Sequence, residues 1–476
     1  MTEATESGTS SSPAEPTSHL RRELGLVSAT SLAITDMIGI GPFITIPLFL
    51  STMGGPQAML GWILGALLAF CDGLVWAELG AAMPKAGGSY NYLRAAFGPD
   101  GAGRWLSFLV VWQIMFSAPL SVASGCIGFS NYIRYLLPSL ATPRVSILGG
   151  ELTGMSLVAV TLPLVLILLL YRRIRVVGKI SVVMLAGVLA GCLWIVVSGL
   201  PHFSSARLFD FPPDAFRMNI AFWAGLGHAT LYALYDYFGY YNVCYLGGEI
   251  RDPGRVIPRA MLFSIALVGL LYILMNVSIL SVIPWREAQQ STFIASTFIE
   301  RLQGSGAASW MTLLMLWIAF ASVFSVLLGY SRIPYAAAVD GNFFRAFARL
   351  HPRGDFPHVS LLTLGLVASV FSLLRLPDVI GSLVATRILV QYLPQTVGFF
   401  RLRWRAPDLA RPFRMWLYPL PGMLSILGWL YILATSTPRS LLFAVAVFAL
   451  GSLTFFARER FYRHSRHPEK FPVESR

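Results

Sequence analysis

The sequence predicts an all-α membrane protein with twelve transmembrane helices, of which the first and the sixth are broken near their middles. Three observations lead to this prediction. Hydrophobic residues make up 55% of the 476-residue chain and charged residues only 12%, which is typical of a polytopic membrane protein. The hydrophobic residues gather in long segments. Two of these segments carry glycine, proline or charged residues near their centres.

Each segment is long enough, or nearly so, to cross a bilayer as a helix. A helix rises about 1.5 Å per residue, so about 20 mainly apolar residues span the hydrocarbon core. The segments run at about residues 27–51, 56–83, 104–132, 152–171, 176–200, 216–246, 260–283, 310–336, 358–374, 379–400, 415–434 and 440–457. All four cysteines lie within them, so we expect small, reduced core residues.

The first segment is interrupted between Thr35 and Thr45, where two glycines and Pro42 occur in mid-span. Glycine and proline both disfavour a continuous helix. Lipid tolerates broken backbone only where protein or a water-filled cavity satisfies the freed amides and carbonyls. This stretch is therefore expected to line a cavity. A simple proline kink is the alternative, which a matching break in the second half of the chain would disfavour.

A matching break is expected in the sixth segment. Its central stretch, residues 228–242, contains Asp236, Gly239 and several aromatic residues, which make a poor lipid-facing helix. Paired interruptions in the first spans of two halves are typical of transporters with a substrate site at the bilayer midplane. An interfacial aromatic belt or plain packing is the alternative. Belts lie at helix ends, however, and this run lies midway.

Lysine and arginine are distributed unequally between the two sides of the predicted membrane. With both chain ends in the cytoplasm, 26 of the 36 fall in cytoplasmic segments and 8 outside, while Arg332 and Arg387 lie within spans. Such an excess is typical of cytoplasmic loops. The sequence therefore predicts a multi-pass protein of the cell membrane with cytoplasmic N- and C-termini. The net charge of +13 follows from this topology, and no nucleic-acid partner is expected.

Four fragments resemble the amino acid-polyamine-organocation (APC) transporters, and the resemblance covers about residues 20–457. The fragments are Gly39-Ile40-Gly41-Pro42-Phe43; Ala77-Glu78-Leu79-Gly80 with Pro84-Lys85-Ala86-Gly87-Gly88-Ser89-Tyr90; Gly247-Gly248-Glu249-Ile250-Arg251-Asp252-Pro253; and Ser331-Arg332-Ile333-Pro334-Tyr335-Ala336 with Asp340-Gly341. They occur in the family's order and on the expected side of the membrane.

The resemblance implies two inverted repeats of five helices, at about residues 21–200 and 201–405, and two peripheral helices at 406–457. Residues 1–20 are expected to form a disordered cytoplasmic tail and residues 458–476 a basic one. The resemblance also implies transport by alternating access, with no enzymatic reaction. The substrate carboxylate is expected against amides of the first break, and its ammonium against carbonyls of the first and sixth helices, because helix ends leave such groups free.

The residues of the two breaks are therefore the candidate substrate-binding residues. They are Ile38, Gly39, Ile40, Gly41 and Phe43 in the first helix, and Asp236, Tyr237, Phe238, Gly239 and Tyr240 in the sixth. Candidates for the cavity wall or a gate are Asp36, Trp112, Gln113, Phe116, Tyr241 and Arg387. Ser322 and Ser325 on the eighth helix are candidates for a sodium site with carbonyls of the first helix, although serine is also favoured at helix contacts.

Charged residues inside spans are costly to bury unpaired, so each suggests a function. Asp36, Asp236 and Arg387 lie at similar depths near the midplane, and we predict that the last two pair, directly or through water, in at least one state. A structural ion pair without a transport role is the alternative. Helix capping or loop anchoring is expected instead for acidic residues nearer the span ends. These are Asp72, Glu78, Glu249 and Asp340.

The sequence departs from the family pattern in three ways. Ile40 and Pro42 replace a hydroxyl residue and an aliphatic one in the first break, and proline lacks the N–H that would bind a carboxylate. Tyr241 stands where some relatives have a glutamate. No lysine occurs near Gly187 or Val188 in the fifth segment, where proton-coupled relatives carry one. The first departure weakens the amino acid prediction, and the last leaves the coupling ion, H⁺ or Na⁺, undetermined.

The sequence thus predicts a secondary transporter for amino acids. A polyamine or other organic-cation transporter of the same fold is the alternative, since a Gly-Pro-Phe run also resembles the polyamine branch. A channel or sensor would need a pore-lining ring or a signalling domain, and an enzyme would need a nucleophile-base set or metal ligands, none of which is visible. The expected partners are a small-molecule substrate and the lipid bilayer, without a cofactor and with no obligatory protein partner visible.

Overall fold

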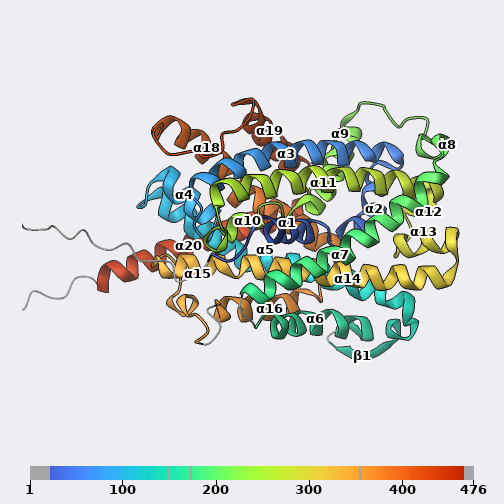
Figure 1. The fold of residues 1–476 in the computed structure, drawn as a ribbon, viewed down its shortest axis with the longest axis horizontal. Helices are drawn as coiled ribbons and strands as arrows, with labels where there is room; N and C mark the ends of the chain where they lie inside the picture. The colour runs from blue at the N-terminus through green and yellow to red at the C-terminus, as the bar shows by residue number, and fades with distance from the viewer. Residues whose placement is uncertain (1–21, 148–149, 172–173, 353–355, 466–476) are drawn as a thin grey trace, which may run out of the picture.

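The computed structural model describes residues 22–147, 150–171, 174–352 and 356–465, and it is a bundle of helices (Figure 1). One short antiparallel pair of strands, β1 and β2, follows α5. The described chain ends lie at one end of the bundle together with α4 and α15, and we call this the terminal end (Figure 1). The predicted tail at residues 1–20 and residues 466–476 of the basic tail lie outside the described residues.

The elements have the following bounds. The first half contains α1 Leu26–Met37, α2 Gly41–Met53, η1 Pro56–Ala58, α3 Met59–Ala82, α4 Ser89–Phe97, α5 Ala102–Leu136, η2 Pro138–Ala141, β1 Pro143–Ile147, β2 Gly150–Thr153, α6 Gly154–Leu170, α7 Ile174–Gly199, η3 Leu200–His202 and α8 Ser205–Leu208. The second contains α9 Ile220–Tyr237, α10 Asn242–Tyr245, η4 Gly247–Glu249, α11 Pro253–Val282, α12 Trp285–Ala288, α13 Ile294–Gln303, α14 Ser305–Tyr330, α15 Arg332–Val339, η5 Arg345–Ala348, α16 His358–Phe371, α17 Leu376–Arg387, η6 Ile388–Tyr392, α18 Leu393–Arg405, α19 Leu420–Thr435 and α20 Pro438–Ser465.

Within the described residues, eight helical stretches are long and apolar enough to cross a membrane. Three shorter apolar helices, α6, α16 and α19, and the broken α9 lie in the other predicted segments. Every predicted segment therefore contains a helix, and the protein is a multi-pass membrane protein. The count of twelve spans stays a prediction, because a helix shorter than about 20 residues does not by itself cross the hydrocarbon core.

Both predicted interruptions are present in the structure. Helix α1 ends at Met37 and α2 begins at Gly41, while α9 ends at Tyr237 and α10 begins at Asn242. In the second break Gly239 has a φ of +127°, a conformation that a residue with a side chain rarely adopts. The sequence prediction of two discontinuous helices is therefore confirmed.

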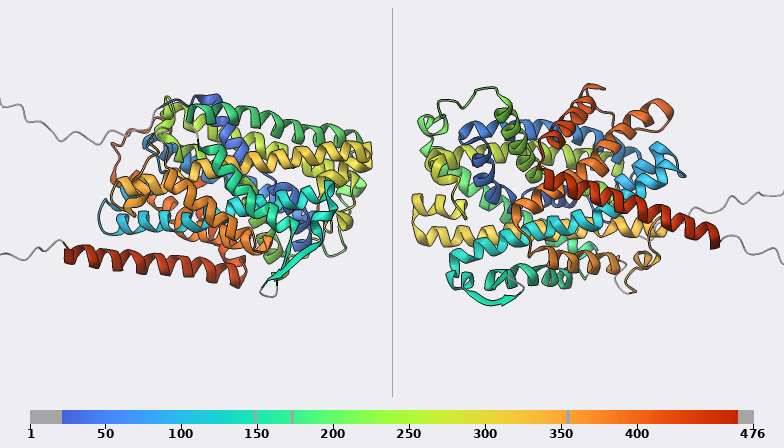
Figure 2. Two further views of the ribbon diagram at one scale, coloured as in Figure 1. Left: turned by 90° about the horizontal axis from the view of Figure 1, so that it is seen from below. Right: turned by 180° about the vertical axis from the view of Figure 1, so that it is seen from behind.

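The broken helices form the centre of the bundle. In the span Leu26–Met53, 94% of the most apolar stretch is buried inside the protein, against 28% for Pro438–Arg460. Helix α20 accordingly lies along the outside of the bundle (Figure 2). Helix α1 packs against α7, α11 and α14, and α9 packs against α2 and α3. Helices α3 and α11 also pack against each other, so the two broken helices are held by one continuous core.

The tenth apolar segment contains an irregularity that the sequence did not indicate. Within residues 379–400, α17 is followed by a turn of π-helix, η6, directly after Arg387. The following helix carries Pro394 in its first turn, and proline donates no hydrogen bond to the preceding turn. A π-turn of this kind is often found at functional sites. It places Arg387 at an irregular point of the helix.

Acidic residues near the terminal end anchor loops, as predicted. Glu249 forms a buried ion pair with Arg332 at 3.0 Å, and Asp340 forms an exposed one with Arg94 at 2.8 Å. Glu78 contacts two arginines of the segment after the tenth predicted span, with distances of 2.6 and 3.2 Å. Asp72 accepts a hydrogen bond from Tyr240 at 2.6 Å and so ties the sixth break to α3.

Candidate substrate site

A small cavity lies where the two broken helices meet. Its lining comes from α1, α2, α5, α9, α14, α17 and the two breaks. The lining residues are Asp36, Met37, Gly39, Ile40, Gly41, Ser121, Gly125, Tyr235, Asp236, Phe238, Ser322, Val326, Tyr330, Leu383 and Arg387. The cavity volume is about 30 Å³. This holds about two water molecules. The described conformation must therefore open before a larger molecule enters.

The ends of the half-helices give this cavity its polarity. Helices α1 and α9 both end at it, so the negative ends of their dipoles face the same region. The Tyr272 hydroxyl lies within hydrogen-bond distance of the last carbonyls of both, 2.6 Å from Met37 and 3.1 Å from Asp236. Helix α2 begins there at Gly41, and Ile40 and Gly41 line the cavity at its N-terminus, whereas the amide of Phe43 donates to the Ile40 carbonyl at 3.1 Å. Pro42 in the first turn of α2 has no N–H group. One site thus has donors for an anion beside acceptors for a cation.

Three charged side chains line the cavity, and all three are buried. Asp236 accepts a hydrogen bond from Thr45 at 2.5 Å, and Arg387 donates to the hydroxyl of Tyr241. One carboxylate oxygen of each aspartate, Asp36 Oδ2 and Asp236 Oδ1, and Nη2 of Arg387 have no hydrogen-bond partner among the described residues. These atoms are available to a molecule that enters the cavity.

The predicted pair of Asp236 and Arg387 is not formed in the described conformation. Each side chain has another partner, and no ion pair joins the two among the described residues. Arg387 lies close enough to Asp36 to attract it electrostatically. A pairing of Asp236 with Arg387 in another state stays a prediction.

The two breaks share a sequence pattern and a reciprocal contact. In each, an aspartate at the next-to-last position of the half-helix precedes a glycine by three residues, at Asp36 with Gly39 and at Asp236 with Gly239. A side-chain carbon added at Gly239 would lie 2.8 Å from the Asp36 carboxyl carbon, and one added at Gly41 would meet the Asp236 carboxylate. Each aspartate therefore lies against the break of the other helix.

The residues before the aspartates continue this correspondence. Thr35 and Ser325 share a hydrogen bond of 2.7 Å between α1 and α14. Tyr235 donates to Ser124 at 2.7 Å, which joins α9 to α5. A hydroxyl beside each aspartate thus holds its half-helix to a serine on a neighbouring long helix.

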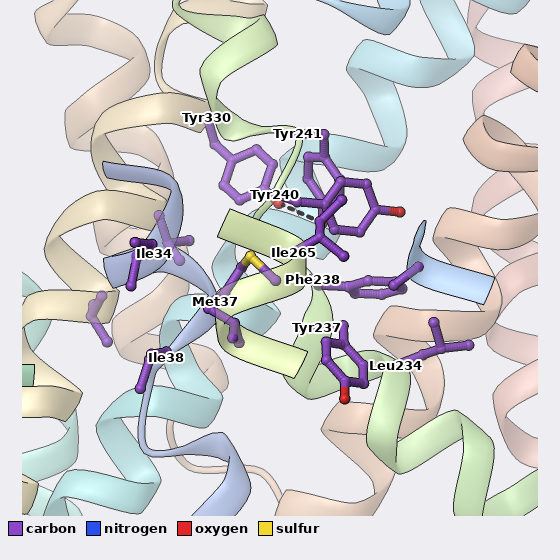
Figure 3. Close-up of a cluster of buried hydrophobic side chains, with 14 of the residues drawn as sticks. Ile34, Met37, Ile38, Leu234, Tyr237, Phe238, Tyr240, Tyr241, Ile265 and Tyr330 are labelled. Carbon is purple, nitrogen blue, oxygen red and sulfur yellow. Dashed lines mark hydrogen bonds between the residues drawn. The ribbon is translucent and has the colours of Figure 1, made fainter. Parts of the chain in front are cut away.

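Aromatic side chains close the terminal side of the cavity. Trp76 stacks on Tyr241 with ring centres 5.0 Å apart, and Tyr245 and Tyr392 pack against the same rings. Tyr241 and Tyr330 share a hydrogen bond of 3.2 Å, which Figure 3 shows beside the ends of α1 and α9. All five rings are buried. We call these five residues the aromatic layer.

The other side of the cavity is less covered. Three lining residues, Ser121, Tyr235 and Ser322, are partly exposed, whereas the other lining residues are buried. Tyr235 precedes the break in α9, which runs toward the terminal end, so it lies on the far side of the break from the aromatic layer. The described conformation is thus closed most firmly toward the terminal end.

Most of the predicted site residues lie at the cavity or directly beside it. The lining includes Asp36, Gly39, Ile40, Gly41, Asp236, Phe238, Ser322 and Arg387. The other residues predicted in the breaks are buried next to it without lining it, and these are Ile38, Phe43, Tyr237, Gly239 and Tyr240. Tyr241 belongs to the aromatic layer, and its role as a gate stays a prediction.

The residues predicted on the third helix lie elsewhere. Trp112 donates its indole N–H to Val447 of α20 at 3.1 Å, and Phe116 packs beside Trp112. Gln113 joins a buried network in which it donates to Gln391 at 2.9 Å. None of these three lines the cavity in this structure, because α5 turns another face to it.

The third-helix residues that do line the cavity are small. Ser121 and Gly125 lie four residues apart, on one face of α5. The sequence prediction favoured large polar and aromatic side chains and did not include Ser121 or Gly125. Small residues at this spacing are a recognisable signal of close approach between helices, and this signal would have found them.

The predicted sodium ligands are engaged in protein contacts. Ser322 donates to the main-chain carbonyl of Asp36 at 3.4 Å, and Ser325 bonds with Thr35. A side-chain carbon added at Gly39 would lie 3.0 Å from the Ser322 Cβ, so the first break packs closely on α14. A packing role for these serines and the predicted ion site both agree with this geometry, and the ion site stays a prediction.

Two discontinuous helices that meet at a buried, charged cavity within a membrane bundle define the class of transporters with a midplane substrate site. The family model described as amino acid permease matches residues 24–455. The chain belongs to the amino acid permease family. This agrees with the resemblance that the four sequence fragments indicate.

Several curated proteins are similar to this chain. It is 28% identical over 432 residues to "Large neutral amino acids transporter small subunit 2" of Homo sapiens, covering 88% of this chain and 76% of that protein. It is 29% identical over 438 residues to "Asc-type amino acid transporter 1" of Mus musculus, with 88% and 77% covered. It is 27% identical over 457 residues to "b(0,+)-type amino acid transporter 1" of Mus musculus, with 94% and 90% covered.

Proposed function

We propose that this protein is a secondary transporter that moves amino acids across the cell membrane by alternating access. The observation that carries the proposal is the meeting of two broken helices at a buried cavity, in a chain whose similar proteins are named as amino acid transporters. The proposal includes twelve spans, of which the first ten form two inverted repeats. No enzymatic reaction is part of it.

The shared pattern of the two breaks supports the inverted repeat. Asp36 and Asp236 occupy the same position in the first helix of each proposed half, and each contacts the other half's break. The flanking hydroxyl bonds reach α5 and α14, which are the third helix of each half. A two-fold relation between the halves predicts such reciprocal contacts, in the same way as it does at an interface between identical subunits.

The main-chain groups at the breaks supply the recognition of an amino acid. The substrate carboxylate binds the amides of Ile40 and Gly41 at the start of α2, and the predicted contact with the Phe43 amide would require that its hydrogen bond to the Ile40 carbonyl break. The ammonium binds the carbonyls at the ends of α1 and α9. Because these groups belong to the backbone, they recognise the part that all amino acids share.

Alternating access requires that the aromatic layer open in another conformation. In the described one it seals the terminal side, which we propose to be the cytoplasmic side, and the excess of lysine and arginine there supports this orientation. Release into the cytoplasm past Tyr241 and Tyr330 would then need the hydrogen bonds of these two hydroxyls to break. The coupling ion, H⁺ or Na⁺, is not assigned. Trp317 lies over Gly187, where proton-coupled relatives carry a lysine.

Ligand-induced stabilisation of the purified protein tests the substrate class. Free amino acids are expected to raise the melting temperature, because a ligand stabilises the state that binds it. Amino acid amides and decarboxylated amines lack the carboxylate that the α2 amides bind, and we expect little effect from them. The readout is thermal unfolding in detergent at matched ligand concentrations.

The alternative of a polyamine or organic-cation transporter rests on the two buried carboxylates in the cavity. Stabilisation by putrescine or spermidine, with none by any amino acid, would establish it and refute the amino acid proposal. Uptake of radiolabelled substrates into proteoliposomes gives the same decision by an independent route.

A protein partner is a separate question that one similar protein raises. Its name includes the words "small subunit", which concern that protein. The four cysteines of this chain are all buried and unpaired, so a partner would have to be held without a disulfide to them. The sequence prediction of no obligatory partner therefore stays open, and the mass of the complex in native membranes tests it.

Thiol labelling in intact cells tests the proposed orientation. Single cysteines that replace Arg255 or Arg345 are expected to be protected from an impermeant maleimide, whereas one that replaces Arg217 reacts. All three positions are exposed in the structure, and the native cysteines are buried, so background labelling is low. Labelling at the first two positions but not at the third would place the termini outside.

A further inference from the structure

The two equivalent aspartates of the breaks line the same cavity as Arg387. Neither forms an ion pair with Arg387 among the described residues. Asp236 accepts a hydrogen bond from Thr45 on α2, which fixes its carboxylate. Asp236 is only 2% exposed, and its Oδ1 has no hydrogen-bond partner among the described residues. The second break thus holds a fixed, buried carboxylate at the cavity without a cation bound to it.

The side-chain charges of the cavity do not cancel. When all three groups are ionised, two carboxylates face one guanidinium, and all three are buried, so solvent screens none of them well. Burying an unpaired charge is strongly unfavourable unless a partner is provided. A molecule that brings one additional positive charge into the cavity would provide that partner for Asp236.

An amino acid with an uncharged side chain does not bring that charge. Its carboxylate and ammonium balance each other and are taken up by the main-chain groups at the helix ends. An amino acid with a cationic side chain has the same two groups and one positive charge more. Its net charge is therefore the complement of the cavity's.

Resting on the proposed amino acid transport, we propose that Asp236 binds the cationic group of the substrate side chain. The preferred substrates are then amino acids such as lysine, ornithine and arginine. Thr45 holds one oxygen of the Asp236 carboxylate, which leaves Oδ1 for the cation. The rings of Tyr235 and Phe238 also line the cavity and offer their faces to a positive charge.

Lysine and norleucine form the matched ligand pair for the test, because both side chains have four carbon atoms in a row and only lysine carries a terminal ammonium. In the wild-type protein, lysine is expected to bind more tightly by about tenfold or more, since a hydrogen bond to a charged group contributes about 1.5–3 kcal/mol. Binding is measured by thermal shift and by competition with uptake.

Asp236→Asn should lower the affinity for lysine by about 10- to 100-fold and change that for norleucine little. Asparagine keeps the shape and an acceptor for Thr45 but loses the charge. Asp378→Asn is the control, since Asp378 is an exposed aspartate in the first turn of α17 and is expected to leave both ligands unaffected. Retained norleucine binding shows that the variant is folded.

The outcomes distinguish failure of the proposed role of Asp236 from failure of the proposed amino acid transport. Norleucine binding as tightly as lysine to the wild-type protein would overturn the role of Asp236 and leave amino acid transport standing, whether or not the variant folds. Cadaverine has both amines of lysine and no carboxylate. If cadaverine binds and neither amino acid does, the proposed amino acid transport itself fails.

Discussion

Arg332→Met is expected to destabilise the protein by about 3–5 kcal/mol, because it leaves a buried carboxylate without its cation. Arg332 pairs with Glu249 at 3.0 Å, and the two side chains are 5% and 1% exposed. The main-chain carbonyl of Glu249 also accepts the amide of Leu24 at the entry of α1. The ion pair therefore fixes the exit of the sixth helix to the entry of the first and to α15. Denaturant unfolding in detergent measures the loss.

A double variant separates charge from packing. Adding Glu249→Leu to Arg332→Met removes both charges and is expected to restore much of the lost stability, since an apolar pair can replace a buried ion pair at little cost. The control is Arg301→Met, which breaks the exposed pair with Glu287 and should cost about 1 kcal/mol or less. Equal losses for Arg332→Met and Arg301→Met would contradict the anchoring role of the buried pair.

Gly239→Ala is expected to abolish uptake by distorting the second break. The φ of +127° at Gly239 is strained for any residue with a side chain, at a cost of about 1–3 kcal/mol. The added carbon would also lie 2.8 Å from the main chain of Asp36 and Met37. Main chain at a helix end cannot move aside as a flexible side chain can, so the two breaks must separate. Uptake into proteoliposomes and thermal unfolding measure the effect.

Gly306→Ala is the matched control for this substitution. Gly306 lies in the first turn of α14, and a side-chain carbon there meets nothing within 4 Å. Alanine also favours the helix, so stability should stay equal or rise. Normal uptake by Gly239→Ala, at a protein level equal to that of Gly306→Ala, would show that the close contact between the breaks is not needed for transport.

The membrane class, the apolar segments and both broken helices were predictable from the sequence. Lipid imposes strong limits on composition and backbone, so Pro42 and Gly39 in one apolar run, and Asp236 and Gly239 in another, mark interruptions without any tertiary information. The anchoring role of Glu249 was predictable for the same reason, because its position at a span end requires a partner at the membrane surface.

The cavity-facing side of α5 was not predictable in this way. Trp112 and Phe116 were favoured as large polar or aromatic residues, but Trp112 bonds to α20 and Ser121 and Gly125 face the cavity. In a soluble helix the polar face identifies the exposed side. A helix inside a membrane bundle is apolar where it meets lipid and also where it meets other helices, so periodicity does not tell the two apart.

By itself the sequence determined that the chain crosses the membrane many times, that two of its helices break, and that charged residues lie at the breaks. Only the tertiary structure decided which groups those charges meet. It placed Asp36, Asp236 and Arg387 around one cavity, gave the Asp236 carboxylate a hydrogen bond from Thr45, and put Tyr241 in the aromatic layer. The physical reason is that local composition fixes whether backbone can lie in lipid, whereas the partner of a buried charge depends on how helices far apart in the sequence pack together.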